Sequence, residues 1–84
     1  MQVYPNPATN AVTIRFAGTT AGRASAYVTD MFGNRVLTLM HNEPVAEGLQ
    51  QKTFETSALP PGLYQCVMTT PDGKRVSTRL SIIH

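Results

Sequence analysis

Few side chains in this sequence could carry out chemistry: one cysteine, two histidines and five carboxylates among 84 residues. Cys66 is the only thiol, and a nucleophilic cysteine needs a histidine or a helix N-terminus beside it to lower its pKa. Its neighbours Gln65 and Val67 supply neither, so we interpret Cys66 as a small core residue. A single cysteine also excludes an internal disulfide and a zinc site built from several thiolates.

The histidines and carboxylates show no spacing typical of a catalytic or metal-binding motif. His41 has no partner at such a spacing, and we interpret it as a solvated side chain. Asp30 precedes a glycine turn, where we expect its carboxylate to accept backbone N–H bonds. Glu43 and Glu47 flank a proline, and we interpret them as solubilising residues of a loop. The glycines that could form a phosphate-binding loop stand singly at turns, and we expect no enzyme activity, metal or cofactor.

The charge pattern also limits the kinds of partner. The formal net charge is +2, and 42% of the residues are hydrophobic. Basic residues are scattered except for a loose group at Lys74, Arg75 and Arg79, without the clustering typical of nucleic-acid-binding proteins. No stretch approaches roughly 20 consecutive apolar residues, the length of a membrane-spanning helix. We therefore expect neither nucleic-acid binding nor a membrane helix.

Alternation of apolar and polar residues predicts strands rather than helices. Val12, Ile14 and Phe16 alternate with polar residues, so one set of side chains faces a core and the other faces water. Similar short runs recur about every 8–12 residues between turn signals, a spacing typical of a sandwich or barrel. The predicted strands are residues 2–4, 11–17, 24–30, 35–41, 49–55, 63–70 and 74–83.

Most of these strands have one clear core face. The further predicted core residues are Ala24, Ala26, Val28, Phe54, Tyr64, Cys66, Met68, Val76, Leu80 and Ile82. The last strand then directs outward the side chains of Arg75, Ser77, Arg79 and Ser81. Residues 35–41 are apolar on both faces, and their core set is either Leu37 with Leu39 or Val36 with Met40.

The connections between the predicted strands are short. Pro44 and Gly48 predict an irregular loop over residues 42–48. A turn is predicted at 18–23, a tight turn at 31–34 and a hairpin turn at 71–73. Short connections favour antiparallel neighbours. We therefore predict an all-β single domain, a seven-stranded antiparallel β-sandwich of immunoglobulin-like type.

Four stretches, taken in order, resemble a known family. They are VYPNPATNAVTIRF at 3–16, AYVTDMFGNRV at 26–36, FETSALPPGLYQCVM at 54–68 and GKRVSTRLSII at 73–83. Their order and spacing resemble the type A C-terminal sorting domain of the type IX secretion system, the Por secretion tail family, which is a seven-stranded β-sandwich. The resemblance covers nearly the whole chain, from Val3 to Ile83.

The resemblance implies structural roles for the earlier motifs and a recognition role for the last strand. The structural motif residues are Tyr4, Pro5, Asn6, Pro7, Asp30, Gly33, Leu59, Pro60, Gly62 and Tyr64. The residues implied in recognition by the translocon or the sortase are Gly73, Lys74, Arg75, Val76, Arg79, Leu80 and Ile82. Family members commonly end in a basic residue after the last strand, whereas this sequence has His84 there.

By the same resemblance the domain is a non-catalytic C-terminal secretion signal. Its implied partners are an N-terminal passenger, the outer-membrane translocon with its shuttle proteins, and a sortase-like cell-surface protease. The passenger would move from the periplasm to the outer membrane and cell surface, where the domain is cleaved off and released and the passenger is anchored. We expect residues 1–84 to be this domain, excised from a larger secreted protein. Residues 1–8 form a lead-in from a linker, and the prolines flanking Asn6 favour an extended lead-in that joins the sheet only at Ala11.

Other functions are compatible with a β-sandwich. A C-terminal edge strand could be recognised by strand addition, because it offers free N–H and C=O groups and a row of side chains. Exposed edges also predict weak homodimers. The alternatives are a binding or adhesion module for carbohydrate or protein, with Tyr4, Tyr27 and Tyr64 as a platform, and a passive spacer domain.

Overall fold

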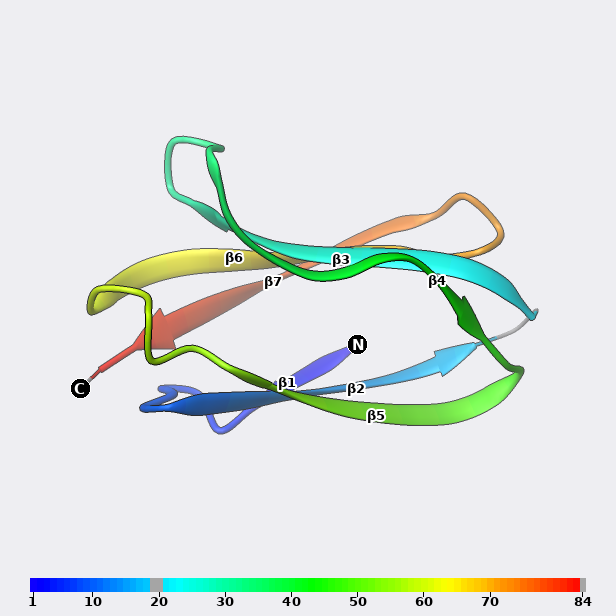
Figure 1. Cartoon of the computed structure of the whole chain (residues 1–84), viewed down its shortest axis with the longest axis horizontal. Helices are drawn as coiled ribbons and strands as arrows, with labels where there is room; N and C mark the ends of the chain where they lie inside the picture. The colour runs from blue at the N-terminus through cyan, green and yellow to red at the C-terminus, as the bar shows by residue number, and fades with distance from the viewer. Residues whose placement is uncertain (19–20, 84) are drawn as a thin grey trace.

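The computed structural model describes residues 1–18 and 21–83, which form seven strands. The strands are β1 (Gln2–Tyr4), β2 (Ala11–Gly18), β3 (Gly22–Asp30), β4 (Arg35–Val45), β5 (Gly48–Glu55), β6 (Gly62–Thr69) and β7 (Arg75–Ile82). They build a three-stranded sheet in the order β1-β2-β5 and a four-stranded sheet in the order β4-β3-β6-β7. Figure 1 shows the two sheets as facing layers, and neighbouring strands within each sheet are antiparallel. The predicted antiparallel sandwich is therefore confirmed; Thr19 and Thr20 of one predicted turn, and His84, lie outside the described residues.

The core lies between the two sheets and matches most of the predicted strand faces. On β2, Val12 and Ile14 are buried while Arg15 is exposed, because successive side chains of a strand point to opposite faces. β6 lies between β3 and β7 and buries Val67 on one face and Cys66 on the other. The buried apolar residues of this core are Val3, Ala8, Val12, Ile14, Phe16, Ala24, Ala26, Val28, Leu39, Met40, Val45, Leu59, Tyr64, Cys66, Met68, Leu80 and Ile82.

A bulge decides which side chains of β4 face the core. The register between β3 and β4 shifts so that Leu39 is an extra residue on β4, opposite no residue of β3. An extra residue interrupts the alternation of faces, and consequently Leu39 and Met40 are both buried. Leu37 packs against the margin of the core, and Val36 is exposed. Each of the two predicted sets therefore supplies one buried residue, Leu39 from the first and Met40 from the second.

The loop predicted over residues 42–48 is wrong except at Ala46 and Glu47, which connect β4 to β5. β4 continues to Val45, which is buried, and Pro44 is paired with Arg23 of β3. Proline is tolerated here because β4 is an edge strand of its sheet and needs no ladder N–H on its open side. The strand alternation of β4 thus extends across a residue that usually indicates a loop.

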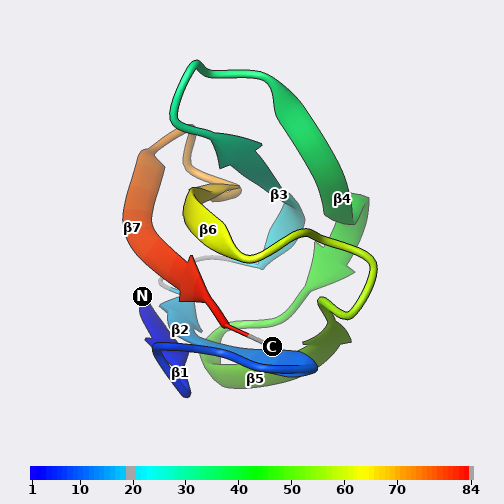
Figure 2. The ribbon, with the colours of Figure 1, turned by 90° about the vertical axis from the view of Figure 1, so that its left-hand side faces the viewer.

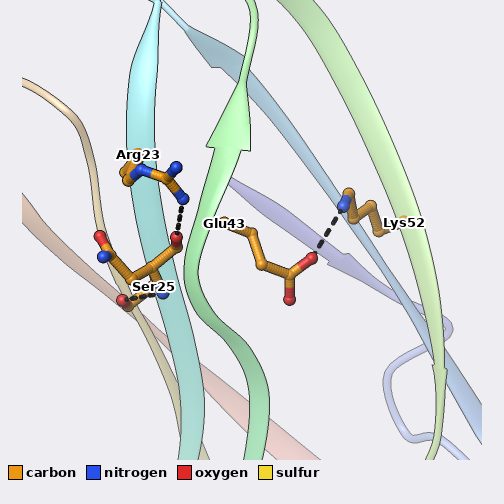
Figure 3. Close-up of polar contacts among 5 residues, drawn as sticks. Arg23, Ser25, Glu43 and Lys52 are labelled. Carbon is orange, nitrogen blue, oxygen red and sulfur yellow. Dashed lines mark hydrogen bonds and ion pairs between the residues drawn. The ribbon is translucent and has the colours of Figure 1, made fainter.

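Polar contacts hold this second half of β4 in place (Figure 3). Arg23 Nη1 donates to the carbonyl oxygen of Asn42 at 2.8 Å, and the Asn42 N–H donates to Ser25 Oγ at 2.9 Å. Glu43 Oε1 lies 3.5 Å from Lys52 Nζ of β5, so this ion pair joins the two sheets. The interpretation of Glu43 as a loop residue is therefore wrong. Because both side chains are more than a third exposed, we expect the pair to contribute no more than about 1 kcal/mol.

Phe54 is a weaker core residue than the sequence predicts. It stands on the core face of β5, opposite Val12, but it is only partly buried. Gln50 and Lys52 on the same face of β5 are also only partly buried. The reason is that β5 is the edge strand of the three-stranded sheet, so its side chains cover the margin of the core.

Candidate recognition surface

The strand implied in recognition, β7, forms one edge of the four-stranded sheet. It pairs along its whole length with β6, from Arg75 opposite Thr69 to Ile82 opposite Gly62. Figure 2 shows β7 at the margin of its sheet, with its arrowhead directed toward the N-terminal segment of the chain. One edge of β7 is thus occupied by β6, and the other faces away from the sheet.

The residues predicted for recognition fall into two groups. Leu80 and Ile82 are buried in the core, and Val76 is partly buried on the same face of β7. The other four residues are exposed, and they are Gly73, Lys74, Arg75 and Arg79. A partner can therefore contact the second group without unfolding the domain, whereas the first group fixes the position of the strand.

The lead-in contacts the open edge of β7, which the sequence analysis did not predict. Asn6 Nδ2 donates to the carbonyl oxygen of Arg79 at 2.8 Å, and the Ser81 N–H donates to Asn6 Oδ1 at 3.0 Å. The Asn6 side-chain amide thus takes the place of a main-chain amide at this edge. The Ala8 N–H donates to Ser81 O and the Ile83 N–H donates to Ala8 O, both at 2.8 Å, which makes a parallel bridge between Ala8 and Ile82.

These contacts correct the expected course of the lead-in. Gln2–Tyr4 already forms β1, paired with β2, and Asn6 and Ala8 are bonded to β7. The lead-in therefore joins both sheets before Ala11, and the prediction that it joins only at Ala11 is wrong. A lone asparagine between prolines gives no sequence signal for a partner 73 positions away, so only the folded chain reveals this contact.

The turn between β6 and β7 orders the start of the recognition strand. The Thr70 N–H donates to Lys74 O at 2.9 Å and the Gly73 N–H donates to Thr70 O at 3.0 Å. Gly73 has φ +86°, which favours glycine. The Asp72 carboxylate accepts a hydrogen bond from the Thr70 hydroxyl. This bond is the main reason that the pKa of Asp72 is lowered from 3.8. Lys74 Nζ is 4.0 Å from Asp72 Oδ2, and its side chain is 80% exposed.

The turn between β3 and β4 is built around Asp30. Its Oδ1 accepts the N–H groups of Phe32 and Asn34, both at 2.9 Å, and its Oδ2 accepts Asn34 Nδ2 at 3.1 Å. These bonds, led by the one from the Asn34 N–H, lower the pKa of Asp30 below 3.8. Gly33 has φ +86°, as the predicted turn requires. The turn leaves Phe32 91% exposed at its tip, a feature that the sequence analysis missed.

The motif before β6 forms a corner closed by a tyrosine. The Tyr64 hydroxyl donates to Pro60 O at 2.6 Å, and the Leu59 N–H donates to Thr56 O at 3.0 Å. Leu59 and Tyr64 are both buried. A Cβ on Gly62 would lie 3.7 Å from the Tyr64 ring, an ordinary van der Waals contact, so the space beside that ring would admit a small side chain. These contacts bring Leu59, Pro60 and Tyr64 together in one corner, and their structural role stays a prediction.

The sequence of the chain matches a known protein family over residues 2–83, and that family is described as the secretion system C-terminal sorting domain. The chain belongs to this family. The match spans both the lead-in and the recognition strand, as the resemblance in the sequence predicted. Among curated proteins no match was found.

Membership makes the sorting domain a type IX secretion signal. Such a signal interacts with the type IX secretion machinery, and it passes through the periplasm to the outer membrane and cell surface. Domains of this family are non-catalytic. Among the residues that the structure describes, no helix is long and apolar enough to cross a membrane.

The remaining candidate groups of the sorting domain lie apart from one another. Tyr64 is buried, Tyr27 is partly buried beneath the Arg35 guanidinium at 3.9 Å, and Tyr4 stands on the other sheet with its hydroxyl 2.8 Å from Gln51 Oε1. They do not form the platform considered for a carbohydrate-binding module. Burial raises the pKa of the Cys66 thiol to about 11. Within residues 1–18 and 21–83 no three His, Cys, Asp or Glu side chains gather as a metal site.

Proposed function

We propose that the sorting domain directs an N-terminal passenger through the outer-membrane type IX translocon by presenting the exposed residues of β7 and its preceding turn. Translocon and shuttle proteins contact Gly73, Lys74, Arg75 and Arg79, while Val76, Leu80 and Ile82 hold the strand in the register that exposes them. The observation that carries this proposal is that Arg75 and Arg79 are exposed on one face of the edge strand β7. The opposite face of β7 buries Leu80 and Ile82 in the core.

The proposal extends to the processing of the passenger. Residues 1–84 act as the sorting domain, and the passenger precedes the lead-in. A sortase-like cell-surface protease cleaves on the N-terminal side of the folded sandwich and releases it, and the passenger is then anchored at the surface. The exposure of Tyr4, Pro5, Asn6 and Pro7 supports an accessible junction.

A charge-reversal pair tests the role of the exposed strand. A fluorescent reporter with a periplasmic export signal is fused ahead of residues 1–84 in a host that has the type IX system. We expect Arg79→Glu to reduce surface delivery at least tenfold, and Arg15→Glu, an exposed change on the outer face of the other sheet, to leave it within twofold. Deletion of residues 74–84 should abolish delivery. Equal delivery by the Arg79→Glu and Arg15→Glu fusions would show that β7 is not the recognised strand.

A further inference from the structure

We propose that an extended acidic segment of a partner protein adds as a further strand to the first half of the open edge of β7, over residues 75–79. The Asn6–Ala8 segment closes the second half of that edge and so fixes where the added strand ends. This inference rests on the proposed function, because it gives the mode of recognition and the chemistry of the partner for the same strand.

The hydrogen bonds of the lead-in show which main-chain groups of β7 point outward. Arg79 O, Ser81 N, Ser81 O and Ile83 N are all bonded to Asn6 or Ala8. In an antiparallel pair the N–H and C=O of alternate residues point away from the neighbouring strand. The odd-numbered residues of β7 therefore direct their main-chain groups away from β6, and this set includes Arg75 and Ser77.

The two halves of this edge differ in whether these groups are bonded. In the second half the Asn6 amide and the Ala8 main chain occupy them. In the first half, no hydrogen bond within the described part of the chain reaches the outward groups of Arg75 and Ser77, and both residues are exposed. Residues 75–79 in extended conformation span about 17 Å, which matches a strand of common length.

The charge around residues 75–79 favours one kind of added strand. Lys74, Arg75 and Arg79 are exposed beside it, and opposite charges on facing strands stabilise a pair while like charges destabilise it. A second copy of the chain is disfavoured: in an antiparallel pair of two β7 strands centred on Ser77, Arg75 of each copy would face Arg79 of the other. A segment with Asp or Glu at alternate positions would instead meet opposite charge.

Strand addition of this kind combines main-chain hydrogen bonds with side-chain selection. An edge that is open only from Arg75 to the N–H of Arg79, whose carbonyl oxygen is bonded to Asn6, is also less prone to pair with other chains than a fully open one. The Asn6–Ala8 segment therefore sets the register of the added strand, because a longer insertion would have to displace the bonds to Arg79 and Ser81.

A proline substitution separates strand addition from folding. Ser77→Pro removes an N–H that points away from β6, and proline is tolerated on the open side of an edge strand. Ser77→Ala is the matched control because it keeps the N–H and changes only the side chain. The probe is the blocked pentapeptide Glu-Val-Glu-Val-Glu, with Lys-Val-Lys-Val-Lys as the charge control, and binding is followed through the amide chemical shifts of the isotopically labelled domain.

We expect the acidic peptide to perturb amides of residues 75–79 and the basic peptide to leave them unchanged. Ser77→Pro should weaken binding at least tenfold, whereas Ser77→Ala should stay within twofold of the wild-type chain. Asn6→Ala should extend the perturbed amides to Ser81. If Ser77→Pro does not fold, the double variant Arg75→Glu with Arg79→Glu, which changes only exposed side chains, should give the same loss of binding.

Four results would overturn the inference: no binding of the acidic peptide, equal binding of both peptides, binding unaffected by Ser77→Pro, or self-association through β7 without peptide. The same variants in the export assay distinguish this inference from the proposed function. If the wild-type fusion reaches the cell surface and Ser77→Pro is delivered as well as Ser77→Ala, strand addition is wrong while the secretion signal stands. If the wild-type fusion is not delivered, the proposed function fails, and the peptide experiment still decides the binding mode.

Discussion

Leu80 provides a quantitative test of the register of β7. Its side chain is fully buried in the core between the sheets, so Leu80→Ala removes buried methyl groups and leaves a cavity. Such a change costs about 2–5 kcal/mol. A domain of this length has a free energy of unfolding of about 4–13 kcal/mol, so the substitution removes a large share of the stability.

The measurement is thermal and urea unfolding followed by circular dichroism. At about 4–8 °C per kcal/mol for a domain of this size, we expect the Tm of Leu80→Ala to fall by at least about 8 °C. The matched control is Leu63→Ala on β6, where the side chain is 52% exposed, and its cost should stay within about 0.5 kcal/mol. If Leu80→Ala melts with the wild-type chain, or if Leu63→Ala costs as much, the assigned register of β6 and β7 is wrong.

Four further predictions follow from single residues. Asp30→Asn should destabilise the domain at pH 7. Because the folded pKa of Asp30 lies below 3.8, the difference in free energy of unfolding between wild type and variant should disappear as the pH falls through that folded pKa. Unfolding curves between pH 7 and pH 2 measure this difference, and a difference that stays constant contradicts the prediction. Thr56→Val should stabilise the domain by about 1 kcal/mol, measured by urea unfolding, because the Thr56 hydroxyl is buried without a hydrogen-bond partner among the described residues; a loss of stability would indicate a partner. Phe32→Ala should leave the Tm within about 2 °C, since Phe32 is 91% exposed, and a larger fall would mean that it packs. Alkylation of Cys66 at pH 8 should be about 100-fold slower in the native than in the urea-unfolded chain, because burial raises its pKa from 9.0 to about 11; equal rates would place the thiol at the surface.

Local alternation predicted most of the fold, and the exceptions have identifiable causes. The core faces of β2, β6 and β7 follow from period-two patterns, which need no knowledge of the neighbouring strands. In β4 the period-two pattern gave the wrong prediction in two places. The bulge at Leu39 changes the period within the strand, and Pro44 indicates a loop in general but is permitted on an edge strand. The position of a strand at a sheet edge depends on the strand order of the whole sheet, and the local sequence pattern does not predict it.

The candidate surface was predictable only in part. The exposed basic residues of β7 follow from the pattern, and the implied recognition role comes from the resemblance to the family. The bonds of Asn6 to Arg79 and Ser81 join the two ends of the chain, and no local rule relates residues so far apart in sequence. The exposure of Phe32 likewise depends on how the Asp30 turn projects from the sheet.

Residues 1–84 are proposed to act on a passenger as a type IX export signal. The most direct measurement compares one reporter fusion in two hosts that differ only in whether the type IX translocon is intact, by surface labelling and fractionation. We predict reporter at the cell surface in the intact host and in the periplasm of the translocon-deficient host. Surface delivery in both hosts, or periplasmic retention in both, would contradict the claim.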